Sequence, residues 1–230
     1  MISLIGLLDG ITASSIVLSS TIFGLLSFYR ASKLGAKLLA IAGLTMFFVG
    51  FLWLGPMVDF FMVLFTETNL NPQMIYSVLS YMWVAPALIT AMYLGSELMI
   101  PKRKWIIVGI YIVLGIIFEY FLWFHNSESF SFKLVPGDLI DAEFRREYFT
   151  FILVAFFLLS TLIFLGIGFL IKSKQATGDL RKRFIYLALG FIIFVVCGAL
   201  DSIIPPGVAI GFIRVIMMTF ALWMYLGLKT

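Results

Sequence analysis

The sequence predicts an all-α integral membrane protein, a single domain of residues 1–230 that forms a bundle of seven transmembrane helices. Three observations predict this class: the composition, the lengths of the apolar runs and the positions of the basic residues. Of the 230 residues, 62% are hydrophobic and only 12% are charged, about half the charged fraction of a soluble domain. A lipid bilayer is therefore the expected partner of most of the chain, and a multi-pass position in the cell membrane is the expected localisation.

Seven apolar runs are long enough to cross about 30 Å of hydrocarbon at about 1.5 Å per helical residue. They lie near residues 4–28, 38–63, 74–99, 105–124, 148–171, 184–203 and 208–228. The first run is too long for the core of a signal peptide, and no Lys or Arg precedes it. We therefore expect it to be a permanent span.

The basic residues predict the orientation of these spans. Twelve of the 16 lysines and arginines fall on one side of the predicted topology. They are Arg30, Lys33, Lys37, Lys102, Arg103, Lys104, Lys172, Lys174, Arg181, Lys182, Arg183 and Lys229. Only two acids, Glu97 and Asp179, lie on that side. Because cationic loops stay on the cytoplasmic side, we expect the N-terminus outside and the C-terminus inside.

The outer loops are expected to be short, except for the loop of residues 125–147. In this loop the stretch SFSFKLV alternates as a short extended segment does, the following PG predicts a turn, and Asp138 is placed to cap a helix that runs into the fifth span. No other outer loop has room for a structured lid over the bundle. The alternative interpretation is a plain connector.

The four letters MYLG occur at residues 92–95 and again at 224–227. About one such match is expected by chance in so apolar a chain, but both copies end a span at the inner face. Asp59 and Asp201 likewise stand near the outer ends of the second and sixth spans. These matches are compatible with a parallel three-plus-one-plus-three repeat. Two prolines of the first half have no counterpart in the second, and basic inner hairpins would arise by convergence as well.

Charged side chains inside the spans are the first candidates for a functional site, because burying a charge in lipid is costly unless it is paired or hydrated. Arg214 lies about 9 Å into the seventh span from its outer end, and Glu119 lies about 7 Å into the fourth. Asp59 and Asp201 are near the outer boundary, and Asp9 begins the first span. An arginine among four acids indicates either a polar ligand-binding cavity or a salt bridge that locks the seventh helix to a neighbour.

Three aromatic residues of the outer halves, Trp53, Tyr81 and Trp83, are expected to line the same cavity, with packing or lipid exposure as the alternative for each. Pro86 within the third span predicts a kink beside a pocket. The run TASSIVLSST at residues 12–21 predicts close packing of the first helix against its neighbours.

The residue types argue against an enzyme. His125 and Cys197 each stand alone, so the chain has no histidine cluster for a metal and no Ser-His pair within a span. The seventh span has no lysine for a retinal Schiff base, and the acids lie toward one side rather than along a proton path. We expect no catalytic residues, no metal and no cofactor. The net charge of +4 follows from membrane orientation and predicts no nucleic-acid partner.

The stretch FYRASKLGAKLLAIAGLTMFFVGFLWLGPMVDF and the later MYLGSELMIPKRKW resemble the seven-helix sensor region at the N-terminus of some prokaryotic histidine kinases. The resemblance covers about the first four spans. It implies an outward-facing sensory bundle that transmits a helix shift inward. No kinase, cyclase or dimerising coiled coil follows the seventh span up to residue 230, so any output is expected to require a separate cytoplasmic signalling partner.

The leading hypothesis is a receptor-like or sensor-like protein that binds an unknown small ligand in an outward-facing polar cavity. Its candidate ligand-binding residues are Arg214, Glu119, Asp59, Asp201, Trp53, Tyr81 and Trp83. The alternatives are a small-solute transporter built on the helix repeat and a structural subunit of a membrane complex. A transporter must open to both sides, whereas the inner halves contain almost no ionisable residue besides Glu97, which favours the one-sided cavity.

Overall fold

The computed structural model describes residues 2–135 and 137–228, and seven helical segments within them are long and apolar enough to cross a membrane. They are Leu4–Leu34, Lys37–Thr66, Met74–Met99, Pro101–Phe124, Phe149–Gln175, Gly178–Asp201 and Val208–Leu228. Each overlaps one predicted run, which confirms the predicted class, a multi-pass membrane protein of seven long helices. The sixth helix begins before the expected residue 184 because the basic stretch that starts at Gly178 is already helical.

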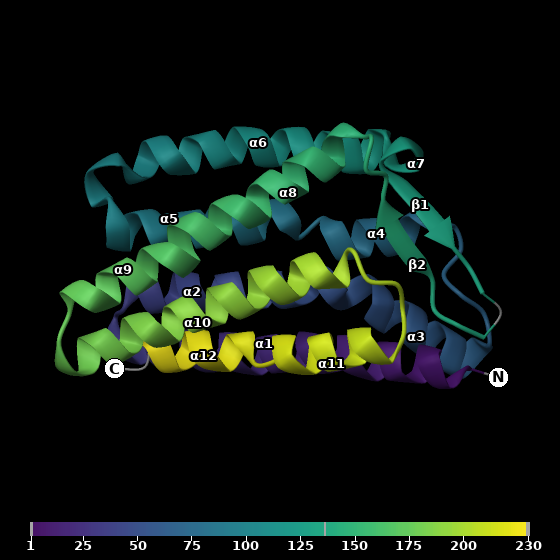
Figure 1. Ribbon diagram of the computed structural model, residues 1–230, viewed down its shortest axis with the longest axis horizontal. Helices are drawn as coiled ribbons and strands as arrows, with labels where there is room; N and C mark the ends of the chain where they lie inside the picture. Colours follow the sequence, from purple (N-terminus) through teal and green to yellow (C-terminus); the bar gives the residue numbers. More distant parts are fainter. Residues whose placement is uncertain (1, 136, 229–230) are drawn as a thin grey trace.

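Two of the seven segments are unbroken helices, α1 (Leu4–Leu34) and α10 (Gly178–Asp201). The others are divided into α2 (Lys37–Gly50), η1 (Phe51–Trp53) and α3 (Leu54–Thr66); α4 (Met74–Tyr81) and α5 (Val84–Met99); η2 (Pro101–Arg103) and α6 (Lys104–Phe124); α8 (Phe149–Thr161), the π-helical η3 (Leu162–Ile167) and α9 (Gly168–Gln175); α11 (Val208–Met217) and α12 (Phe220–Leu228). Figure 1 shows these helices lying side by side along the long axis of the molecule.

Two of the interruptions follow from proline. Pro56 and Pro86 are each the third residue of the helix that follows a break, α3 after η1 and α5 after the gap at residues 82–83. Proline has no amide hydrogen, and its ring clashes with the carbonyl four residues earlier, so it is tolerated only near the start of a helix. The kink predicted at Pro86 is therefore confirmed, and Pro56 has the same effect in the second span.

The predicted close packing of residues 12–21 is confirmed. Ser19 Oγ donates a hydrogen bond of 2.8 Å to the carbonyl of Met218, which lies in the break between α11 and α12. On another side of α1, a Cβ added to Gly50 would lie 1.5 Å from Ser20 Oγ. Only glycine at this position lets α1 and α2 approach so closely.

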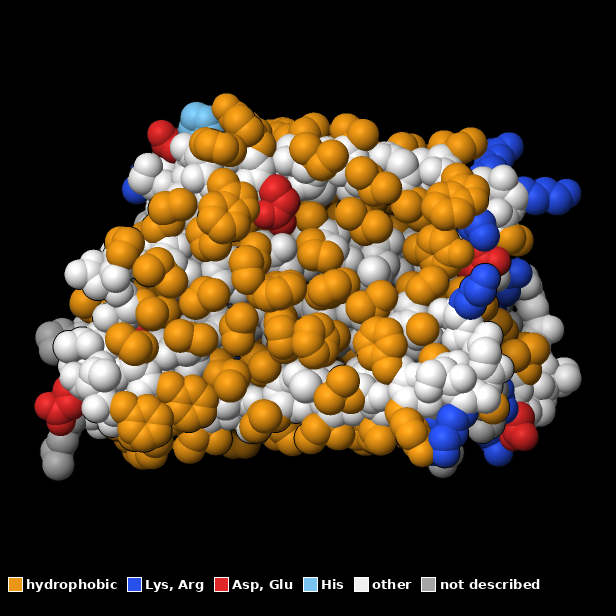
Figure 2. Space-filling model, turned by 180° about the vertical axis from the view of Figure 1, so that it is seen from behind, with side chains coloured by type: hydrophobic (Ala, Val, Ile, Leu, Met, Phe, Trp, Pro, Cys, Tyr) orange, Lys and Arg blue, Asp and Glu red, His pale blue; other side chains and the backbone are white. Residues whose placement is uncertain are grey.

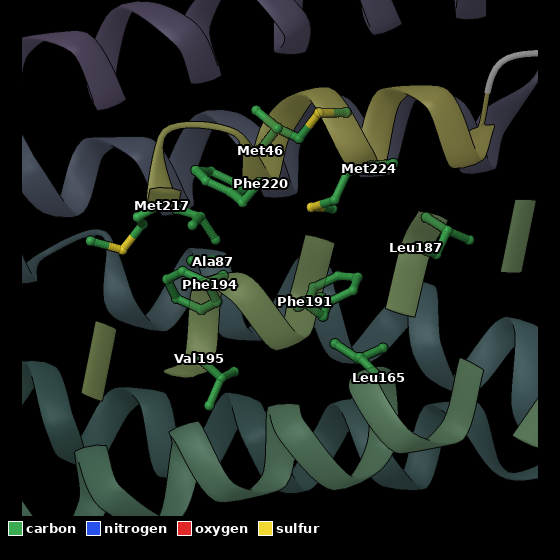
Figure 3. Packing of buried hydrophobic residues seen from close by; sticks show 14 of the residues in the cluster. Met46, Ala87, Leu165, Leu187, Phe191, Phe194, Val195, Met217, Phe220 and Met224 are labelled. Carbon is green, nitrogen blue, oxygen red and sulfur yellow. The ribbon is translucent and has the colours of Figure 1, made fainter. Parts of the chain in front are cut away.

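The hydrophobic core has α10 at its centre. Figure 3 shows Phe191 and Phe194 of α10 between α12, which contributes Phe220 and Met224, and the fifth span, which contributes Leu165. The rings of Phe194 and Phe220 are 5.9 Å apart. These side chains fill the middle and the inner half of the bundle with apolar contacts.

The outer surface of the bundle has the character expected in lipid. Figure 2 shows apolar side chains over most of the face in view and a concentration of Lys and Arg at one end. Large side chains such as Ile106 and Phe212 are about two-thirds exposed, at 65% and 69%. Contiguous apolar exposure of this extent indicates contact with lipid. The basic end carries the loops that are expected in the cytoplasm; this orientation stays a prediction from the distribution of charge.

A β-hairpin covers the opposite end of the bundle. The helix α7 (Asn126–Ser129) leads into β1 (Phe130–Lys133), which pairs with β2 (Asp141–Phe144) in antiparallel register, with Phe130 opposite Phe144. In Figure 1 the hairpin lies across the end at which the chain begins. The extended segment predicted at 129–135 is thus present in part.

The prediction for Asp138 is wrong. We expected Asp138 to cap a helix running into the fifth span, but α8 begins only at Phe149, after β2. The Asp138 carboxylate instead accepts a hydrogen bond from Ser3 Oγ at the start of α1. Of the predicted PG turn, Pro136 lies outside the described residues, and Gly137 has a positive φ of 86°, which glycine adopts at little cost.

Candidate functional site

Arg214 of α11 is the centre of a buried ionic cluster that joins four spans. Its Nε donates to Asp201 Oδ1 at 2.7 Å, and its Nη1 donates to Asp9 Oδ1. Asp201 Oδ2 accepts a third bond, of 3.1 Å, from Trp53 Nε1. The side chains of Arg214, Asp9 and Asp201 are only 9%, 10% and 15% exposed. The cluster therefore connects α1, η1, the end of α10 and α11.

The charges in this cluster stabilise one another, because each would otherwise be buried without a partner of opposite sign. Asp201 is the last residue of α10, where the helix dipole is unfavourable for a carboxylate. Arg214 offsets that effect, and it also compensates Asp9. Because the two carboxylates face one guanidinium, the cluster carries a formal charge of −1, and removal of the arginine would leave two uncompensated charges in a poorly hydrated region.

A cavity of about 190 Å³ lies beside the cluster. Asp201, Arg214, Trp53 and Tyr81 line it, and further walls come from α2, α3, α5, α8 and β2. The volume is below the roughly 300–1,000 Å³ of pockets for drug-sized ligands, so it suits a smaller molecule or several waters.

The cavity opens toward the hairpin end and ends within the bundle. The residues at its rim include Arg146, Ser202 and Ile203, and all three are exposed to solvent. Its lining in α5 extends as far as Ala91, about 10 Å beyond the first residue of that helix. Deeper in the bundle the core is closed by side chains with no exposure, including Leu94. Among the described residues, none of the basic loops contributes to the lining.

Aromatic rings form much of the wall at the outer end. Tyr76, Tyr81 and Phe144 all line the cavity. The ring of Tyr81 lies 4.6 Å from that of Phe144 in the hairpin and 5.0 Å from that of Phe130. Neither Tyr76 nor Tyr81 forms a hydrogen bond through its phenolic oxygen with another described residue, so both hydroxyls are available to a ligand or to water.

The hairpin adds a carboxylate. Asp141 of β2 lines the cavity and is partly buried. Its side chain forms no hydrogen bond or ion pair within the described ranges, whereas the neighbouring Glu143 bonds to Lys133 Nζ at 2.6 Å. Burial, and then the charge of Glu143, raise the pKa of the Asp141 carboxyl above its usual value. This carboxyl is thus held close to the cavity without an ion-pair partner among the described residues, and the charges of Lys133, its cross-strand neighbour, and of Arg214 only partly offset the rise in its pKa.

The structure brings together four of the seven predicted site residues: Arg214, Asp201, Trp53 and Tyr81. Asp59 lies elsewhere and is completely buried. Its carboxylate accepts hydrogen bonds from the backbone amides of Leu70 and Ile140, at 2.7 and 2.8 Å, and from Asn69 Nδ2 at 3.0 Å. Asp59 therefore ties two outer loops to α3 and is not among the residues that line the cavity.

The other two predicted residues also lie away from the cavity lining. Glu119 of α6 accepts a hydrogen bond of 3.2 Å from Trp123 Nε1 one turn further along the same helix, and its contacts do not include Arg214. Trp83 stacks on Phe48 with ring centroids 5.9 Å apart and makes an edge contact with Phe51 at 5.0 Å. Trp83 thus packs against the second span, whereas Glu119 is bonded only within its own helix, and its other carboxylate oxygen has no hydrogen-bond partner among the described residues.

Sequence reasoning missed the contributions of Tyr76, Asp141 and Phe144. The alternation in the loop 125–147 indicated a structured segment that could serve as a lid, but nothing in it indicated which residues would face the bundle. Asp9 was identified as an intramembrane acid and was not placed in the site. The signal that could have included Asp9 is that a buried guanidinium has five N–H donors and therefore requires several acceptors.

Comparison with known proteins does not extend these observations. No protein-family model, curated protein or solved structure matches the chain.

Proposed function

We propose that the protein is a receptor-like seven-helix membrane protein that binds a small ligand in the cavity between the Arg214 cluster and the β-hairpin. The observation that carries this proposal is the position of Asp201: its carboxylate lines the cavity and is bonded to both Arg214 and Trp53. A ligand that contacts Asp201 changes the balance of a cluster that holds four spans together.

The distribution of charge supports an outward-facing site. The basic loops gather at the end away from the hairpin (Figure 2), and such loops stay in the cytoplasm. The cavity then opens to the outside and the loops that meet a separate cytoplasmic signalling partner lie inside. The interruptions in the second, third, fifth and seventh spans provide places at which helices change their packing when the ligand binds.

A small-solute transporter is the second candidate. The breaks between α4 and α5 and between α11 and α12 favour it, because interrupted helices border the substrate sites of many transporters. The closed core below Ala91 favours the receptor, since no described residue of the basic end lines the cavity.

Cavity filling tests the assignment of the site. Purified protein in nanodiscs is screened for small molecules that raise its melting temperature, and each hit is tested again on Ala87→Phe, which places a ring in the cavity, and on Ala155→Phe, which places one on the lipid-facing side of α8. A cavity ligand stabilises the wild type and Ala155→Phe but not Ala87→Phe. Stabilisation that persists in Ala87→Phe contradicts the assignment.

Transport is measured separately. The radiolabelled hit is offered to liposomes that contain the wild type or Ala87→Phe. The receptor proposal expects no accumulation inside the vesicles above that of empty liposomes. Uptake by the wild type that Ala87→Phe abolishes would instead establish the transporter.

A further inference from the structure

The cavity is poorly suited to an anion, although an arginine lies in its wall. The Nε and Nη1 groups of Arg214 already donate to Asp201 and Asp9. These two carboxylates outweigh the single positive charge of the guanidinium, so an anionic ligand that approached its Nη2 group would meet a net negative cluster. Arg146, the other cation among the lining residues, is exposed at the rim, where water and salt screen its charge.

Around the cavity, in contrast, there are more carboxylates than cations to compensate them. Arg214 faces Asp9 and Asp201, and Lys133 is bonded to Glu143. Asp141 is left with no ion pair among the described residues, although it is partly buried in the cavity wall. A partly buried carboxylate beside a cavity produces a negative potential there.

The aromatic wall of the cavity also favours a cation over an anion. The rings of Trp53, Tyr76, Tyr81 and Phe144 line the outer part of the cavity. Cations are attracted to the electron-rich faces of such rings, and quaternary ammonium groups are recognised by surfaces that combine aromatic rings with a nearby acid.

We infer that the ligand is a small organic cation, a protonated amine or quaternary ammonium, whose charged group lies between Asp141 and the aromatic wall and whose apolar part extends toward Ala87 and Phe157. This inference rests on the proposed ligand-binding function and specifies its chemical class. The deeper lining, which includes Ala87 and Phe157, is apolar and suits a short hydrocarbon group.

Charge-selective cysteine labelling tests the inference with two reagents of known charge. In a Cys197→Ala background, single cysteines replace Thr161 within the cavity and Ser202 at its rim. The protein in nanodiscs is treated with two methanethiosulfonates of similar size, one with a trimethylammonium group and one with a sulfonate. Each labelling rate, followed by mass spectrometry, is divided by the rate of the same reagent with a free thiol.

The cationic reagent is expected to label Thr161→Cys faster than the anionic reagent. The added change Asp141→Asn should reduce the ratio of the two rates by about threefold or more, because removal of one negative charge weakens the attraction of the cationic reagent and the repulsion of the anionic one at the same time. Asp179→Asn, at the basic end, is the matched control and should leave the ratio unchanged.

The outcomes separate the two proposals. Equal labelling of Thr161→Cys by both reagents, or a ratio that Asp141→Asn does not change, overturns the cation inference and leaves the cavity proposal standing. If neither reagent labels Thr161→Cys while both label Ser202→Cys, the cavity is not reached from outside, and both proposals fail.

Discussion

Replacement of Arg214 by Met is the most informative perturbation of the bundle. Methionine keeps a side chain of similar length but removes the guanidinium, so Asp9 and Asp201 lose the cation that they share. All three side chains are well shielded from solvent, since the most exposed, Asp201, is 15% exposed. Removal of one partner from a buried ion pair costs about 3–5 kcal/mol because the opposite charge remains uncompensated.

The free energy of unfolding of Arg214→Met is expected to fall by about that amount, and most of the loss should be recovered when Asp9→Asn and Asp201→Asn are added. Unfolding in mixed micelles, followed by tryptophan fluorescence as the denaturing detergent increases, measures both effects. Arg181→Met, on the exposed start of α10, is the matched control and should change stability by less than about 0.5 kcal/mol.

Two results would refute the reasoning about Arg214. A loss smaller than about 1 kcal/mol would mean that the cluster is hydrated well enough to behave as a surface pair. A loss that the two neutralising substitutions do not reduce would mean that the guanidinium stabilises the bundle by packing, not by its charge.

Three further predictions concern the outer end and the orientation. Asp59→Asn replaces one of the two carboxylate oxygens, which accept separately from the amides of Leu70 and Ile140, by an amide donor and is expected to cost about 1–3 kcal/mol. Hydrogen exchange should accelerate at the amide that loses its acceptor, and unchanged protection of both amides would contradict this role. Burial and the adjacent Glu143 raise the pKa of Asp141, so the folded protein keeps its proton to a higher pH than the unfolded chain does. Stability should therefore fall as pH rises from about 4 through the raised pKa; a slope that Asp141→Asn does not flatten would exclude this group as its source. In intact cells, a membrane-impermeant thiol reagent should label Ser127→Cys and not Gln175→Cys, and the reverse pattern would invert the topology.

The candidate site was only partly predictable because its members come from segments that are far apart in the sequence. Arg214 stood out because an intramembrane arginine is rare, but four acids at comparable depth were available to pair with it. Asp201 and Asp9 point toward Arg214, whereas Asp59, at a similar level, is saturated by loop amides. Glu119 bonds to Trp123 within its own helix and makes no hydrogen bond to Arg214. The choice among these acids depends on how each helix is rotated, and rotation is decided by packing.

The sequence alone predicted seven helices long and apolar enough to cross a membrane, because span length and apolar composition are local properties that lipid imposes on each segment separately. It also indicated the break at Pro86, since proline acts on its own helix. Only the tertiary structure decided that Asp9, Trp53, Asp201 and Arg214 meet and that the hairpin carries Asp141 over the cavity. These relations depend on close packing between distant segments, which a single local pattern does not encode.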